Sequence, residues 1–281
     1  LAALLALPPT LDGTSRRWIA MSKPDSNPPN PDWKTTTLIV AAHGSSRHPG
    51  AKHVHRHIET LRQQNLFADV QAGFLKETPL LSDVLSAIRT DQAYIVPMVT
   101  GRGYITDTLI PDMISGSECP ADVKLCEPVG NHPMLASIMA DRVRGVLDDN
   151  ALPKNDSAFL LAAHGNKSNP DVARDGVAIA DQLGRDLNIS SAAAFIEHAP
   201  LITDWSKLLH ETNIIVMPFL VGGGFHGLKD VPDMLGLGTV DESAGVTGPY
   251  ELQGRSLWCC PPVGNETAIA DIIIQRVDSA S

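Results

Sequence analysis

The chain contains 281 residues, of which 43% are hydrophobic, and its formal net charge at pH 7 is −10. A chain of this length and composition can form one large or two ordinary globular domains with well-buried cores. The acidic balance argues against a duplex nucleic-acid ligand, because binding to phosphates requires clustered basic residues. We therefore expect a globular protein with no nucleic-acid partner.

The cysteines and the first residues bear on the cellular location. The four cysteines lack the CxxC spacing of a structural zinc site, and the adjacent pair Cys259 and Cys260 suits no ordinary disulfide framework. Residues 1–7 are apolar, but they are too few to span a bilayer and lack the basic leader of a signal peptide. These features predict a cytoplasmic protein without a membrane anchor.

Residues 1–34 are expected to form a disordered lead-in. The run MSKPDSNPPNPD at residues 21–32 is rich in Pro, Ser and Asn, so it cannot bury apolar surface. One interpretation is that the native protein begins at Met21, which would place residues 1–20 upstream of the native start. The intact mass of the protein made from its native gene tests this interpretation.

After the lead-in, short apolar runs alternate with amphipathic stretches. This alternation predicts a βα series, in which a parallel sheet is covered by helices on both faces. In the first half, we expect strands near residues 36–42, 69–74, 93–98 and 123–127, and helices near 50–64, 79–89, 106–115 and 132–148.

The second half repeats the first. LIVAAHG at residues 38–44 aligns with FLLAAHG at 159–165. PMVTGRGYITDTLIPDM at 97–113 aligns without a gap with PFLVGGGFHGLKDVPDM at 218–234. FLKE at 74–77 is matched to FIE at 195–197 by allowing one residue of slack. The phrase that begins at Cys126 recurs at Cys260, after some 13 additional residues in the second copy. Second-half strands are expected near residues 158–163, 191–196, 213–218 and 256–260.

The repeat predicts the domain organisation. We expect an α/β protein with two tandem doubly wound parallel-sheet domains, flavodoxin-like and four-stranded, which arose by internal duplication. They span residues 35–152 and 153–281, because LPKND at 152–156 interrupts two periodic segments. In such sheets, ligands bind outside the carboxyl ends of the strands, so functional residues should follow the strands.

Histidines and glutamates stand at these strand ends. His43 and His164 each follow the first strand of their half, and Glu77 and Glu197 are interpreted as equivalent residues after the second strand. Taken singly, each histidine is more simply a buried group that fixes the following loop. Each glutamate is more simply a partner of a helix N-terminus.

The second half carries the fuller set. His164, Glu197 and His226 are expected to meet in one crevice, and two imidazoles with a carboxylate form a suitable site for a transiently held Co(II), Fe(II) or Ni(II). Gly223 and Gly224 would let a large flat ligand approach the backbone. A nucleotide-binding loop is the less favoured alternative, because neither GxGxxG after the first strand nor a Walker sequence is present.

The first half lacks this set. When the two halves are aligned without a gap, Ile105 is the counterpart of His226. In the same alignment, Arg102 corresponds to Gly223, and Tyr104 corresponds to Phe225. We therefore expect the second half to hold the metal. His43, Glu77, Arg102 and Tyr104 are expected to line the substrate cavity, together with Gly223 and Gly224.

Two further histidines, His53 and His57, share one face of the first predicted helix. The favoured interpretation is a solvated helix face, and the alternative is a cluster that collects metal for the main site.

The AAHG phrase in each half, the F-x-E phrase and GGFHGLKDVP at residues 223–232 resemble the CbiX-type sirohydrochlorin cobaltochelatases, which are class II chelatases, in their long fused form. The resemblance covers nearly all of residues 36–278. It implies ATP-independent insertion of a divalent metal into sirohydrochlorin, on the route to cobalamin or siroheme. It also implies that His164 and His226 take the metal and that Glu197 is the acidic residue of the site.

Cobalt is the metal expected from this resemblance, and iron or nickel would suit the same ligands. The metal would be a substrate, with no tightly bound cofactor, and the fused halves favour a monomer. The substrate is a polyanion and the protein is acidic, so local basic groups must bind it. The candidates are Arg47, Lys52, Arg102, Lys167 and Lys229.

Two other functions are alternatives to metal insertion. A non-catalytic carrier of tetrapyrrole or metal would fit the departure at Ile105. A hydrolase would need a nucleophile, and the chain has no GxSxG sequence.

Overall fold

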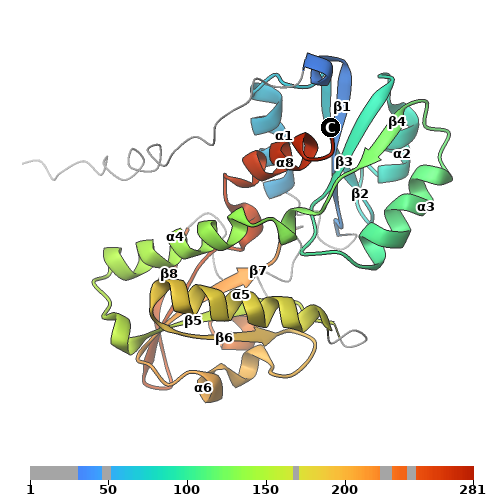
Figure 1. Ribbon diagram of the computed structural model, residues 1–281. Coiled ribbons are helices and arrows are strands. Elements are labelled where there is room, and N and C mark those ends of the chain that lie inside the picture. Colours follow the sequence, from blue (N-terminus) through green and yellow to red (C-terminus); the bar gives the residue numbers. More distant parts are fainter. Residues whose placement is uncertain (1–30, 46–51, 167–170, 222–229, 239–244) are drawn as a thin grey trace, which may run out of the picture. The chain divides into compact units, whose positions relative to one another are not determined.

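The computed structural model describes residues 31–45, 52–166, 171–221, 230–238 and 245–281 (Figure 1). The predicted site residues Gly223, Gly224 and His226 lie outside these residues, as do Arg47, Lys167 and Lys229. Among the described residues, no helix is long and apolar enough to cross a membrane.

The first sheet has four parallel strands in the order β2-β1-β3-β4. Its strands are β1 (Thr36–Ala42), β2 (Asp69–Phe74), β3 (Gln92–Pro97) and β4 (Asp122–Leu125). The helical elements of this half are η1 (Pro31–Thr35), α1 (Lys52–Gln63), α2 (Leu81–Ala87), the π-helix η2 (Ile105–Leu109), α3 (Ile110–Ser115), η3 (Val129–Asn131) and α4 (Met134–Asp149).

The second sheet has five strands in the order β6-β5-β7-β9-β8, with β8 antiparallel to β9. The strands are β5 (Ser157–Ala163), β6 (Ser190–Phe195), β7 (Asn213–Phe219), β8 (Thr247–Leu252) and β9 (Arg255–Cys259). The helical elements are η4 (Lys154–Asp156), α5 (Asp171–Leu187), η5 (Ile202–Asp204), α6 (Trp205–Leu208), α7 (Val231–Leu235), η7 (Val263–Asn265) and α8 (Ile269–Asp278).

The predicted fold class is confirmed, and one detail is wrong. All eight predicted strands are present, but the second domain was expected to have four strands and has five. The extra strand, β8, lies in the segment that was interpreted only as an insertion before the last strand.

The burial of the central strands explains the two-sided packing. All seven residues of β1 are buried, as are all seven of β5. Along β1, Leu38 and Val40 join one apolar cluster, whereas Ile39 and Ala41 face another, which includes residues of α2. Because successive side chains of a strand point to opposite faces, a continuous apolar run fits a sheet covered on both sides.

The packing crosses the boundary between the repeats. Helix α4, from the first half, contacts α5 and β7, and α8, from the second half, contacts α1, β3 and η3 (Figure 1). Arg142 on α4 forms two hydrogen bonds with Glu266, of 2.9 and 2.8 Å. Arg276 on α8 donates to the Pro128 carbonyl at 3.0 Å. The division between residues 152 and 153 therefore describes the sequence repeat. The last helix of each half, α4 or α8, packs against elements of the other half.

Candidate functional site

The candidate site lies where β5 and β6 end. The side chain of His164 follows β5, and its Nδ1 lies 4.0 Å from Glu197 Oε2. The backbone N–H of Glu197 donates to the His164 carbonyl at 3.1 Å, which fixes the two residues next to each other. Both side chains are about two-fifths exposed, at 39% and 40%, so they can reach a ligand. The structure thus brings together the two described members of the predicted metal site.

A glycine follows the strand-end histidine in each half. Gly44 and Gly165 have φ angles of +67° and +73°, a conformation that favours glycine. An added Cβ at Gly165 would lie 2.8 Å from the His198 ring, and one at Gly44 would lie 2.7 Å from Glu77 Cβ. The two positions are therefore equivalent, with His198 and Glu77 in corresponding places.

This equivalence corrects the alignment of the halves at the second strand. The Lys76 N–H donates to the His43 carbonyl at 3.0 Å, just as the Glu197 N–H donates to the His164 carbonyl. Lys76 is therefore the counterpart of Glu197, and the interpretation of Glu77 as that counterpart was wrong.

The chain beyond this point confirms the corrected register. Phe74 bridges to Leu80 and Phe195 bridges to Leu201, at the same offset as the rest of the repeat. The two halves therefore align here without the one-residue gap that the sequence comparison introduced. The run FLKETP and the run FIEHAP, each ending in proline, contained the signal that could have set this register.

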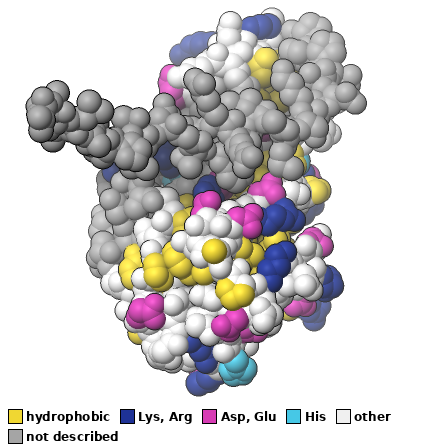
Figure 2. Space-filling model, turned by 90° about the vertical axis from the view of Figure 1, so that its left-hand side faces the viewer, with side chains coloured by type: hydrophobic (Ala, Val, Ile, Leu, Met, Phe, Trp, Pro, Cys, Tyr) yellow, Lys and Arg dark blue, Asp and Glu magenta, His cyan; other side chains and the backbone are white. Residues whose placement is uncertain are grey.

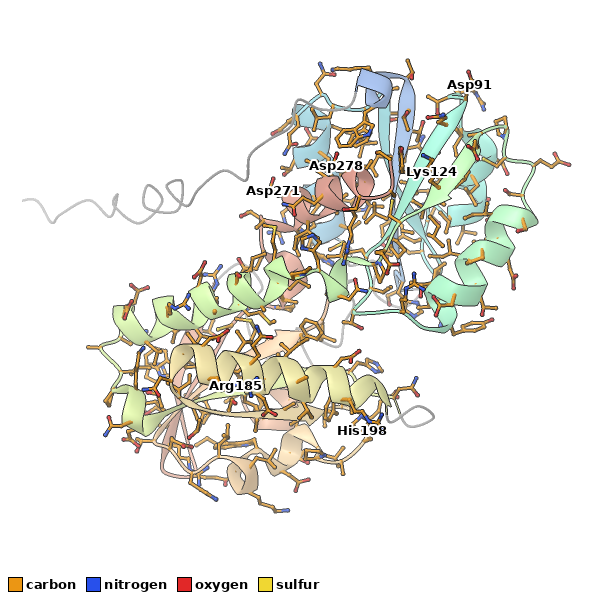
Figure 3. All side chains as sticks on the ribbon, viewed as in Figure 1. Asp91, Lys124, Arg185, His198, Asp271 and Asp278 are labelled. Atoms are coloured by element: carbon orange, nitrogen blue, oxygen red, sulfur yellow. The ribbon has the colours of Figure 1, made fainter. Side chains whose placement is uncertain are left out.

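Glu77 and His198 have local roles in the structure. Glu77 Oε2 accepts a hydrogen bond from the Ser45 N–H at 3.1 Å, which holds the loop after β1. The His198 ring packs on Phe195, with the ring centroids 4.2 Å apart, and its Nδ1 lies 2.9 Å from the Ala199 carbonyl. Figure 3 shows His198 at this edge of the second sheet.

Arg102 and Tyr104 lie in the loop after β3. The Arg102 guanidinium pairs with Glu127, with 3.0 Å between Nε and Oε2, and Tyr104 is 69% exposed. The hydrogen bond with Arg102 lowers the pKa of Glu127 and raises that of Arg102, so both groups stay charged near neutral pH. Ile105 packs against the apolar cluster around α2, so its position serves the core of the first half.

His53 and His57 are not on a solvated helix face, and that expectation was wrong. They are 5% and 3% exposed, because loops of the second half cover this face of α1. His57 Nε2 lies 2.8 Å from the Gly264 carbonyl. Burial lowers the pKa of His57 and, despite a hydrogen bond with the Val221 backbone, lowers the pKa of His53 to about 4. Two buried neutral imidazoles suit packing between the halves better than metal collection from solvent.

Within the described residues, no group of three or more His, Cys, Asp and Glu side chains could hold a metal ion. His164 and Glu197 need a further ligand to make a metal site. The predicted one, His226, lies outside the described residues, between Val221 and Asp230.

Comparisons with known proteins bear on the family of the chain. The sequence pattern of the CbiX family matches residues 37–146 and 158–280. A probable sirohydrochlorin cobaltochelatase of Halobacterium salinarum is 26% identical over 268 residues, which cover 86% of this chain and 91% of that protein.

Two solved structures share the fold. One is CbiX, described as the terminal enzyme for biosynthesis of siroheme in denitrifying bacteria, with 20% identity, a TM-score of 0.66, and coverage of 88% of this chain and 99% of that chain. The other is the sirohydrochlorin chelatase SirB from Bacillus subtilis subspecies spizizenii in complex with cobalt, with 14% identity, a TM-score of 0.66, and coverage of 88% and 95%. Because the family pattern spans most of both halves, the chain belongs to the CbiX family.

Proposed function

We propose that this protein inserts a divalent metal, cobalt in the first instance, into sirohydrochlorin without ATP. The observation that carries the proposal is the His164 and Glu197 pair, with 4.0 Å between Nδ1 and Oε2 at the carboxyl edge of the second sheet of a CbiX-family chain. In this proposal, His226 joins His164 as the second metal ligand. The metal is a substrate that leaves with the product.

The surroundings of His164 favour one tautomer of its ring. Nδ1 lies 3.2 Å from the Gly165 carbonyl oxygen, which can accept a hydrogen carried on Nδ1, and the Glu197 carboxylate lies 4.0 Å away. Nε2 then carries the lone pair, which can bind a metal ion or accept a proton.

Metal insertion requires the removal of two pyrrole N–H protons as the metal enters the ring. An imidazole accepts such a proton readily, since its ordinary pKa lies near the working pH. Glu197, beside the ring and two-fifths exposed, can relay the proton to water. Two imidazoles and one carboxylate hold the metal weakly enough to release it to the macrocycle.

The name of the Halobacterium relative supports cobalt, and the solved SirB complex also contains cobalt. The same ligands accept Fe(II) and Ni(II), so we propose cobalt for cobalamin synthesis first and iron for siroheme synthesis second. We further propose that the protein acts as a cytoplasmic monomer, since both halves are present in one chain.

The test is metallation of sirohydrochlorin by the purified protein with Co(II), followed by the change in absorbance. His226→Ala and Glu197→Gln should abolish or strongly reduce the rate, whereas His210→Ala, at an exposed site after α6, should leave it unchanged. Tight binding of sirohydrochlorin and cobalt without turnover would instead support a carrier and contradict the proposed reaction.

A further inference from the structure

The corrected register reveals a charge difference between the halves. Lys76 and Glu197 occupy the same backbone position, each donating its N–H to the carbonyl of the strand-end histidine. The second half thus places a carboxylate beside His164, whereas the first half has an exposed lysine at the backbone position next to His43. An ammonium group repels a metal cation and attracts a carboxylate ligand.

Arg102 adds a second cation at the same edge. The strand order β2-β1-β3-β4 puts the ends of β2 and β3 on either side of the end of β1. Lys76 follows β2, and Arg102 lies in the loop after β3, where it pairs with Glu127 beyond the end of β4, so the two basic residues belong to loops on either side of β1. Both side chains are exposed, and so is Tyr104.

The acidic residues near these cations already accept hydrogen bonds. Glu77 accepts the Ser45 N–H, Asp107 accepts the Thr106 hydroxyl at 2.9 Å, and Glu127 pairs with Arg102. The Arg102 and Glu127 pair is exposed to solvent, and such pairs contribute little to stability. An incoming carboxylate can therefore exchange with Glu127 for the Arg102 guanidinium.

Contacts at α1 bring the carboxyl edges of the two sheets near each other. His53, close to the start of α1, is buried next to the backbone of Val221, which follows β7. His57 lies 2.8 Å from the carbonyl of Gly264, in η7 after β9. One flat ligand can thus be approached from both halves.

The part of the surface that Figure 2 shows carries charges of both signs. On the face in Figure 2, acidic and basic side chains are interspersed with hydrophobic ones. With a formal net charge of −10, a polycarboxylate must be bound by a local group of cations.

We propose that Lys76, together with Arg102, binds the carboxylates of the tetrapyrrole substrate, while the second half handles the metal. This inference rests on the proposed function. It assigns the first half a specificity role, namely recognition of a polycarboxylated macrocycle. The sequence comparison missed Lys76, because the one-residue gap aligned Glu77, instead of Lys76, with Glu197.

The experiment measures binding of metal-free sirohydrochlorin by fluorescence titration, alongside kcat and KM for cobalt insertion. Lys76→Gln should weaken binding and raise KM about two- to fivefold, as expected for the loss of one exposed charge-assisted contact. Lys76→Glu should weaken binding about tenfold. In both variants kcat should stay near the wild-type value, because the metal site is unchanged.

Two further variants sharpen the test. Glu127→Gln releases Arg102 and should tighten binding about two- to fivefold, the opposite sign. Lys154→Gln removes the same charge from the amino end of the second sheet and should have no effect. The differences among variants should shrink at 1 M salt, where screening shortens the Debye length to about 3 Å.

The outcomes separate the two proposals. Unchanged binding in Lys76→Gln and Lys76→Glu overturns the role of Lys76, even if the wild type inserts cobalt normally. If the wild type binds sirohydrochlorin in a Lys76-dependent way without metallating it, the proposed reaction fails and the binding role stands. A wild type that does not bind sirohydrochlorin overturns both.

Discussion

Gly165→Ala probes the packing that positions His164. Gly165 has a φ of +73°, and an added Cβ would lie 2.8 Å from two atoms of the His198 ring and 3.0 Å from Phe195 Cβ. Adopting this left-handed conformation costs alanine about 1 kcal/mol. The ring packs at a tilt of 36° on Phe195 and would have to shift, so overpacking adds about 1–3 kcal/mol. We expect Gly165→Ala to lose about 2–4 kcal/mol of unfolding free energy.

Gly238→Ala is the matched control. Gly238 has a φ of +71°, but its added Cβ would meet nothing within 4 Å, so only the conformational cost of about 1 kcal/mol applies. Urea denaturation at pH 7 measures both losses. Combining Gly165→Ala with His198→Ala should recover much of the overpacking cost, because the two changes affect one contact. Equal losses in the two glycine variants would refute the assignment of His198 to this position.

Three other predictions concern stability and the first half. The lowered pKa values of His53 and His57 keep both rings neutral in the folded protein. As the pH falls, these histidines therefore bind protons in the unfolded chain at a higher pH than in the folded protein. The unfolding free energy should be at its full value above pH 6.5 and should fall by about 3 kcal/mol toward pH 4. A urea midpoint that does not change between these pH values would contradict the burial of the two rings. Arg142→Ala leaves the Glu266 carboxylate, 13% exposed, without its partner and should cost about 2 kcal/mol in thermal unfolding, whereas a loss below about 0.5 kcal/mol would show that the pair does not join the halves. Ile105→His should destabilise the core around α2. It should not create a second cobalt site, because the first half has Lys76 where the second half has Glu197. Two bound cobalt ions per chain in equilibrium dialysis would contradict this prediction.

Local features made most of the fold predictable. Continuous apolar runs such as residues 36–42 and 157–163 are buried on both faces, and this pattern identifies strands of a doubly wound sheet. The repeated histidine phrases located the strand ends, and the gapless offset after Pro97 identified the difference between Ile105 and His226. The pairing of His164 with Glu197 followed from this topology.

Other features depended on contacts between distant segments. Nothing local marks His53 and His57 as buried, since the loops that cover them lie at Val221 and Gly264, far along the chain. The exchange of α4 and α8 between halves has the same origin. Strand β8 was missed because TGPYEL contains a glycine and a proline, which are unfavourable in strand interiors.

The comparison of His43 with His164 tests the central claim, that a single metal site lies in the second half. The two histidines occupy equivalent positions after β1 and β5, each followed by a left-handed glycine, so they differ mainly in the group that their half places beside them. Single-turnover cobalt insertion into sirohydrochlorin should be abolished in His164→Ala, while His43→Ala should keep a chemical rate close to the wild type. Loss of the rate in His43→Ala with retention in His164→Ala would contradict the account.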